Sequence, residues 1–112
     1  MRFASGLIIA LAACGPGASA SGADVFQLIC ARCHGPTGRP TAELVARQGV
    51  HDLTAPEFRA KVTAEVVENQ VRWGSKNKLM PGFDGAISDE QIKAVAAYVA
   101  SPAFVASSSQ TP

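Results

Sequence analysis

Two thiols and an imidazole stand together in the segment Cys30-Ala-Arg-Cys33-His34. On a helix, residues three and four apart share a face, so all three side chains can address one flat object. The pattern C-x-x-C-H is the attachment signal of c-type haem. The thiols add to the two vinyl groups of the ring, and the imidazole reaches the iron from the same side. The sequence therefore predicts one haem c bound covalently through Cys30 and Cys33, with His34 as an axial ligand.

Three other interpretations of the cysteine pair fit the sequence less well. A thioredoxin-like redox pair needs a βαβ context, and no strand pattern precedes Cys30. A structural zinc site needs four ligands, and the second histidine, His51, is at no ligand-like spacing. We expect His51 to be a loop residue. A disulfide across two intervening residues would constrain almost no chain. Haem attachment is the favoured reading.

A second candidate ligand lies in the loop sequence Leu79-Met80-Pro81-Gly82. Met80 is the only methionine besides Met1, and it stands in a polar, glycine-rich segment rather than in an apolar helical stripe, where a methionine fills the core. Pro81 favours an extended backbone at Met80, and Gly82 permits close approach to a ring face. A thioether opposite an imidazole favours ferrous iron and raises the reduction potential. Filled axial positions leave no vacancy for substrate, which indicates a one-electron carrier and not an enzyme.

The segments that must position these residues have helical patterns. Apolar spacing and end signals predict helices over Asp24 to Cys33, Val62 to Trp73 and Ser88 to Ala100, the last beginning with a capping box. A short helical turn is expected after the capping-box spacing Thr54–Glu57, and one further short helix is expected within 41–49. No alternation typical of strands is present. The fold class is therefore predicted to be all-α.

Composition limits the class of protein further. The 112 residues are 47% apolar, 17% charged and only 6% aromatic, which suits one small domain whose core is thin unless a cofactor supplements it. Ten basic against nine acidic residues exclude the positive charge excess that indicates nucleic acid as a partner. We expect the domain over residues 22–104 and a disordered tail over residues 105–112.

Residues 1–20 have the pattern of an export signal, because Arg2 precedes an apolar run that is too short to cross a bilayer. Two cleavage sites stay open. Cleavage after Ala20 would discard Cys14, whereas Leu11-Ala-Ala-Cys14 resembles a lipobox. In the second case residues 1–13 are removed, Cys14 is lipidated and residues 14–22 form a tether. We favour the lipobox because it accounts for the odd cysteine. A periplasmic location follows, with membrane contact only through the lipid anchor.

These features together resemble the class I, monohaem c-type cytochromes of bacteria. The resemblance covers roughly Gly22 to Phe104 and rests on the order of three features: Cys30 to Gly35, Leu79 to Phe83, and the closing helix from Ser88. It implies a cytochrome c-like helical fold around one covalently held haem, with the N- and C-terminal helices crossing. It also implies His34 and Met80 as the axial ligands.

Two further residues are candidates for positioning the cofactor. The second ring nitrogen of His34 needs an acceptor that fixes the orientation of a metal-bound imidazole. The family commonly uses a proline carbonyl, which makes Pro40 the candidate and Pro36 the alternative. Trp73 carries an indole donor suited to a haem propionate, and a core aromatic is the other reading of it.

The remaining expectations concern partners. Arg72, Lys76 and Lys78 are predicted either to form a positive rim that steers acidic redox proteins or to be solubilising loop charges. Within the carrier class, the chain can act alone or as an electron-transfer subunit of a larger oxidoreductase complex. A haem enzyme or gas sensor with a displaceable sixth ligand, and a thiol oxidoreductase without haem, are the alternatives outside that class.

Overall fold

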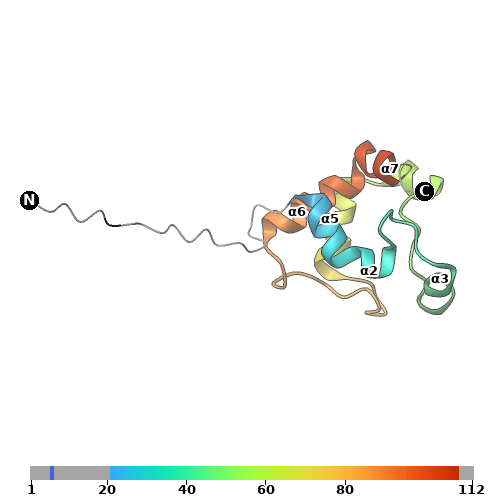
Figure 1. Cartoon of the computed structure of the whole chain (residues 1–112). Helices are drawn as coiled ribbons and strands as arrows, with labels where there is room; N and C mark the ends of the chain where they lie inside the picture. Colours follow the sequence, from blue (N-terminus) through green and yellow to red (C-terminus); the bar gives the residue numbers. More distant parts are fainter. Residues whose placement is uncertain (1–5, 7–20, 109–112) are drawn as a thin grey trace, which may run out of the picture.

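The computed structural model describes Gly6 and residues 21–108 (Figure 1). Apart from Gly6, the predicted export signal, its two cleavage sites and Cys14 lie outside the described residues, as do residues 109–112. The elements are α1 (Gly22–Val25), η1 (Phe26–Cys30), α2 (Ala31–His34), α3 (Ala42–Gln48), α4 (Pro56–Lys61), α5 (Ala64–Trp73), α6 (Asp89–Ala100) and α7 (Pro102–Ser108). The described part of the chain contains no strand beyond an isolated bridge between Asp84 and Ile87. The predicted all-α fold is confirmed.

The first helical stretch is continuous from Gly22 to His34 but changes its pitch. Its middle turn, η1, is a π-helix, a form found mostly as single turns and often at functional sites. The Ser21 hydroxyl caps the start by accepting from the amide of Asp24. Gly35, with φ of 80°, ends it. Cys30 is the last residue of η1, so the unusual turn leads directly into the attachment motif.

Helix α6 lies at the centre of the core and packs against both α1 and α5. Its buried face comprises Ile92, Val95, Ala96 and Val99, as its spacing predicts. Helix α6 approaches α1 closely at Gly22, where an added Cβ would lie 2.7 Å from the Cβ of Tyr98. A glycine is therefore required for the N- and C-terminal helices to pack this closely.

The C-terminal end of the domain differs from the sequence prediction. Residues 105–108, expected to be disordered, belong to α7 (Figure 1). Phe104 is 2% exposed and stacks edge-on against Phe26, with ring centroids 5.1 Å apart. Arg59 of α4 donates to the carbonyl groups of Val99 and Ser101. Pro102 ends α6, yet its fixed φ suits the first turn of a new helix, and the burial of Phe104 holds that helix in place.

Two helix starts also differ from the predicted positions. Helix α5 begins at Ala64, because the Thr63 hydroxyl caps it by accepting from the Val66 amide. Thr54 does not cap α4; its hydroxyl donates to Asp52 instead, and α4 begins with Pro56 after Ala55. The capping box at Ser88 is confirmed, with both reciprocal hydrogen bonds present. Of the helices described, none combines the length and the apolar character needed to cross a membrane.

Candidate functional site

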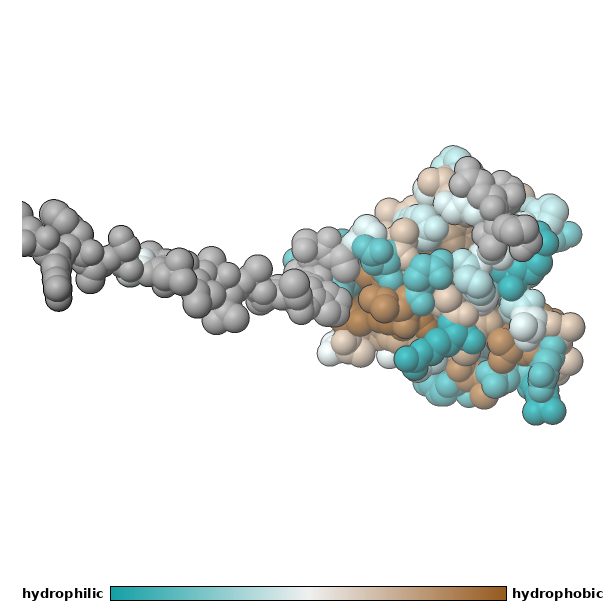
Figure 2. Space-filling model, in the orientation of Figure 1, coloured by the Kyte–Doolittle hydropathy of each residue, from teal (hydrophilic) through white to brown (hydrophobic). Residues whose placement is uncertain are grey.

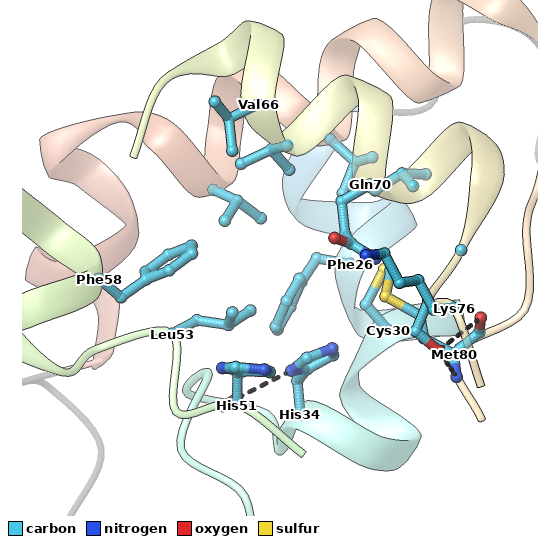
Figure 3. Close-up of a pocket in the computed structure, with 16 residues that line it drawn as sticks. Phe26, Cys30, His34, His51, Leu53, Phe58, Val66, Gln70, Lys76 and Met80 are labelled. Atoms are coloured by element: carbon cyan, nitrogen blue, oxygen red, sulfur yellow. Dashed lines mark hydrogen bonds between the residues drawn. The ribbon is translucent and has the colours of Figure 1, made fainter. Parts of the chain in front are cut away.

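A cavity of about 520 Å³ opens between α5 on one side and the residues that follow the attachment motif on the other (Figure 3). Its apolar walls are formed by Phe26, Leu53, Phe58, Val66, Val67, Val71, Val95 and Val99. A smaller cavity of about 170 Å³ adjoins it and also contains Cys33 in its lining. Both cavities are lined by Cys30, His34 and Met80. The fold thus brings Cys30, His34 and Met80 to both cavities and Cys33 to the smaller one, and the two adjoining cavities together form one hollow.

The two cysteines are free and lie at the edge of this hollow. Cys30 is half-buried at the end of η1, whereas Cys33 is exposed in α2. Burial raises the pKa of the Cys30 thiol to about 11, so the thiol is protonated at neutral pH. An apolar setting of this kind costs little for a thiol or a thioether, because neither carries charge.

The imidazole of His34 is oriented by a backbone carbonyl. Its Nδ1 lies 3.1 Å from the carbonyl oxygen of His51 (Figure 3). Since a carbonyl can only accept, Nδ1 carries the proton and Nε2 keeps its lone pair. Burial lowers the pKa of His34, the His51 carbonyl bond opposes that effect, and the nearby His51 ring adds to it. The neutral form that binds metals is therefore favoured.

The predicted acceptor for His34 was wrong. Pro40 is buried but is not the partner of the ring, and the Pro36 carbonyl accepts from the side chain of Gln27 at 2.7 Å. His51, predicted to be an ordinary loop residue, supplies the acceptor through its backbone and lines both cavities. A carbonyl has no sequence signature of its own, so only the fold reveals this role.

A hydrogen-bonded turn presents Met80 to the cavities. The amide of Ser75 donates to the Met80 carbonyl at 3.0 Å, and the Met80 amide donates to the Ser75 hydroxyl at 3.1 Å. The side-chain oxygen of Asn77 accepts from the Ser75 hydroxyl and from the Leu79 amide. Met80 is half-buried, whereas its neighbour Leu79 is 53% exposed. The turn therefore holds Met80 against both cavities, whereas the more exposed Leu79 lines only the smaller one.

Arg72 does not belong to a free positive rim. Its side chain is only 17% exposed and pairs with Glu68 at 3.0 Å and with Asp84 and Asp89 at 2.7 Å each. These carboxylates raise the pKa of the guanidinium above its ordinary value. Because three acids already surround Arg72, its charge is not available to a docking partner. This part of the predicted rim needs correction.

Of the remaining candidates Lys76, Lys78 and Trp73, only Lys76 lines a cavity. Lys76 lines the larger cavity, and the ammonium group of Lys78 donates to the carbonyl of Trp73 at 3.4 Å. The Trp73 side chain is 59% exposed and lines neither cavity. The structure therefore does not bring the Trp73 side chain to the cavities that Cys30, His34 and Met80 line. Gln70 was not predicted as a site residue, but its side chain lines the larger cavity. The sequence signal for it is a single polar residue on the otherwise apolar face of α5.

The fold and the site define a class. An all-α domain in which a C-x-x-C-H helix and a methionine turn line one apolar hollow is a c-type cytochrome. A flat, largely apolar ring fits this lining, since Cys30 lines both cavities and Cys33 the smaller one, where their thiols can hold the ring, and apolar side chains form the walls of the larger cavity.

Comparisons with known proteins identify the family. Residues 17–99 match the family described as "Cytochrome C oxidase, cbb3-type, subunit III", and the chain belongs to this family of c-type cytochromes. The chain is 37% identical to cytochrome c6 of Leptolyngbya boryana over 83 residues, which cover 72% of this chain and 88% of that relative. The solved structure of the KustC0563 c-type cytochrome superposes with a TM-score of 0.63 at 26% identity, covering 71% of this chain and 94% of the other. The resemblance to class I monohaem c-type cytochromes and the covalently bound haem c are confirmed.

Proposed function

We propose that this haem-based electron carrier is an exported protein whose iron is ligated by His34 and Met80. The observation that carries the proposal is that both residues line the same two cavities, and that hydrogen bonds hold the ring of His34 and the backbone of Met80. His34 is fixed through its Nδ1, and Met80 is fixed through its backbone. Haem c, when bound through Cys30 and Cys33, supplies a reversible one-electron couple.

The chain itself contributes orientation and exclusion of water. The apolar walls from α5 and α6 keep the interior around the iron dry, and a dry, packed shell changes little when the charge of the iron changes. The carbonyl of His51 holds the imidazole in one orientation. No described residue is required as a nucleophile or general base in this scheme, which accords with a carrier rather than an enzyme.

Redox partners are proposed to approach the loop that bears Met80. Lys76, Lys78 and the exposed Leu79 belong to this loop. Apolar contact combined with local positive charge suits short-lived encounters with acidic redox proteins. Figure 2 shows one face of the molecule, on which hydrophobic and hydrophilic residues lie beside one another. The family description favours one second candidate, an electron-transfer subunit of a larger oxidase complex. Co-purification with such a complex distinguishes the two.

The ligand assignment is tested by Met80→Ala. We expect this variant to keep its covalent haem, to lose the charge-transfer absorption of the methionine-ligated ferric form, and to bind carbon monoxide readily when reduced. The midpoint potential should fall by more than about 0.1 V, because axial ligands set haem potentials over about 0.8 V. Val45→Ala is the control, since Val45 is an exposed apolar residue of α3 that lines neither cavity. Unchanged spectra in Met80→Ala would refute methionine ligation.

Export and lipidation are tested by mass spectrometry of the mature protein. Haem addition and acylation each change the mass. A lipoprotein begins at Cys14, whereas cleavage after Ala20 gives a shorter chain without lipid. Cys14→Ser should release the protein from membranes if Cys14 carries the anchor, and a variant that stays membrane-bound would exclude this anchor.

A further inference from the structure

Arg72 and two of its three carboxylate partners, Asp84 and Asp89, lie in or directly beside the loop that carries Met80. This loop, residues 74–88, leaves α5 at Gly74 and enters α6 at Ser88. Arg72 is in the last turn of α5, Asp84 follows Met80 in the loop, and Asp89 is the first residue of α6. The guanidinium of Arg72 therefore joins the last turn of α5 to the part of the loop after Met80 and to the start of α6.

The main chain reinforces the same junction. The last carbonyl groups of a helix have no partner within the helix. Here the Val71 carbonyl accepts from the Phe83 amide at 2.9 Å, and the Arg72 carbonyl accepts from the Asp84 amide at 3.1 Å. The segment of the loop after Met80 thus closes the end of α5, and the Arg72–Asp84 pair lies directly beside these bonds.

The loop is tightly packed at this point. A Cβ at Gly82 would lie 2.9 Å from the Arg72 carbonyl oxygen, so the returning chain runs against the end of α5. Because Asp84 is 12 residues from Arg72 in sequence, holding the two together restricts every residue between them, Met80 included.

We propose that Arg72 is a positioning residue for Met80, acting through Asp84 to keep the methionine turn closed onto the cavity. The inference rests on the proposed ligation by Met80 and adds a second requirement to it. The pair Arg72–Glu68 lies within α5, four residues apart, and does not constrain the loop. Glu68 and Asp84 pair with the same guanidinium, but only Asp84 belongs to the loop. Comparing the loss of each carboxylate therefore separates the effect of loop closure from the effect of losing an ion pair.

The experiment measures how readily imidazole displaces the native sixth ligand in the ferric holoprotein. Asp84→Ala should raise the apparent affinity for imidazole by about three- to tenfold, the range of a charge-assisted hydrogen bond on a partly exposed residue. Glu68→Ala should stay within about 1.5-fold of the wild type, since its loss leaves the loop tethered. The midpoint potential and the ferric charge-transfer absorption of Asp84→Ala should shift in the same direction as in Met80→Ala, but less far.

The Met80→Ala background separates the two hypotheses. In that background Asp84→Ala should have no effect on imidazole affinity, because no methionine remains to be displaced. Wild-type protein that binds imidazole as tightly as Met80→Ala would refute the ligand assignment itself. A resistant wild type in which Asp84→Ala behaves like Glu68→Ala would overturn only the role of Arg72. An Asp84→Ala effect that persists without Met80 would also overturn it, since the pair would then control access rather than ligation.

Discussion

At the scale of single residues, two glycines of the segment around Met80, Gly74 and Gly85, have similar backbone angles but different surroundings. Gly74 has φ of 74°, and a Cβ there would lie 2.7 Å from the Gly82 amide nitrogen. Gly85 has a similar φ of 81°, but a Cβ there would meet nothing within 4 Å. A residue with a Cβ would be strained at either position, but the space around the two positions differs.

Gly74→Ala should therefore disturb Met80, whereas Gly85→Ala should not. Both variants should lose about 1–3 kcal/mol of unfolding free energy from the left-handed backbone. With Met80 ligated as proposed, only Gly74→Ala should also weaken the ferric charge-transfer absorption, because relief of the clash moves the chain that holds Met80. Chemical denaturation and optical spectra check the two effects. Equal spectra for both variants would show that the close approach at Gly74 is unimportant for the methionine.

At the scale of elements, helix ends have unequal importance although their caps look alike in sequence. Ser88 caps α6, which has four buried residues. Thr41 caps α3 by the same kind of bond to the Leu44 amide, yet α3 has no buried residue. Helix stability in proteins comes mostly from the packing of an apolar face, so loss of the two caps should have different consequences.

Ser88→Ala should lower the free energy of unfolding by about 1 kcal/mol, which corresponds to about 4–8 °C in Tm for a domain of this size. Thr41→Ala should fray α3 locally and change the global Tm by less than half as much. Thermal unfolding monitored by circular dichroism measures both. A Thr41→Ala variant as destabilised as Ser88→Ala would mean that α3 is coupled to the core more strongly than its exposure indicates.

These elements also show what sequence can reveal. The capping box at Ser88, the stop at Gly74 and the C-x-x-C-H helix are local signals, and each was predicted near its actual position. The errors share another cause. Helix α7 exists because Phe104 is buried by residues distant in sequence, and the His34 acceptor is a carbonyl 17 residues away. Such features depend on tertiary contacts, for which a short sequence window has no signature.

At the scale of the whole molecule, stability should depend on pH through the Arg72 cluster. Hydrogen bonding to Arg72 lowers the pKa of Asp89, Arg72's charge adds to this, and Lys93 contributes weakly. The unfolded chain therefore takes up the proton more readily than the folded one. Stability from this group is present above the unfolded pKa of about 3.9 and is lost as pH falls through the lower folded value. Asp84 and Glu68 are the other carboxylates facing Arg72.

Asp89→Asn should accordingly flatten the acid limb of the stability curve. Urea unfolding at several pH values between about 5 and 2 should show a smaller loss of free energy in the variant than in the wild type, because a proton no longer competes with Arg72 at this position. Near pH 7 the two curves should have the same slope. Parallel curves throughout the acid range would mean that Asp89 has the same proton affinity in both states.

The correction at Arg72 also changes how the whole molecule should attract a partner. Ten basic and nine acidic residues leave almost no net charge, so long-range steering must come from local groups, and Lys76 beside the cavity is the cation best placed to supply it. Lys76→Gln should slow oxidation of the ferrous protein by hexacyanoferrate(III) about two- to fivefold at 0.01 M ionic strength, where the Debye length is about 30 Å. Lys61→Gln, whose lysine lines neither cavity, is the control and should have a smaller effect.

Stopped-flow rates at several ionic strengths, with the midpoint potential of each variant measured alongside, separate steering from driving force. At 1 M salt the Debye length falls to about 3 Å, so the Lys76→Gln and wild-type rates should converge. A deficit that persists at high salt with an unchanged potential would place the effect of Lys76 in the transfer step and not in the encounter. Equal slowing by Lys61→Gln would mean that the small anion responds to overall charge and that the Met80 loop has no special part in docking.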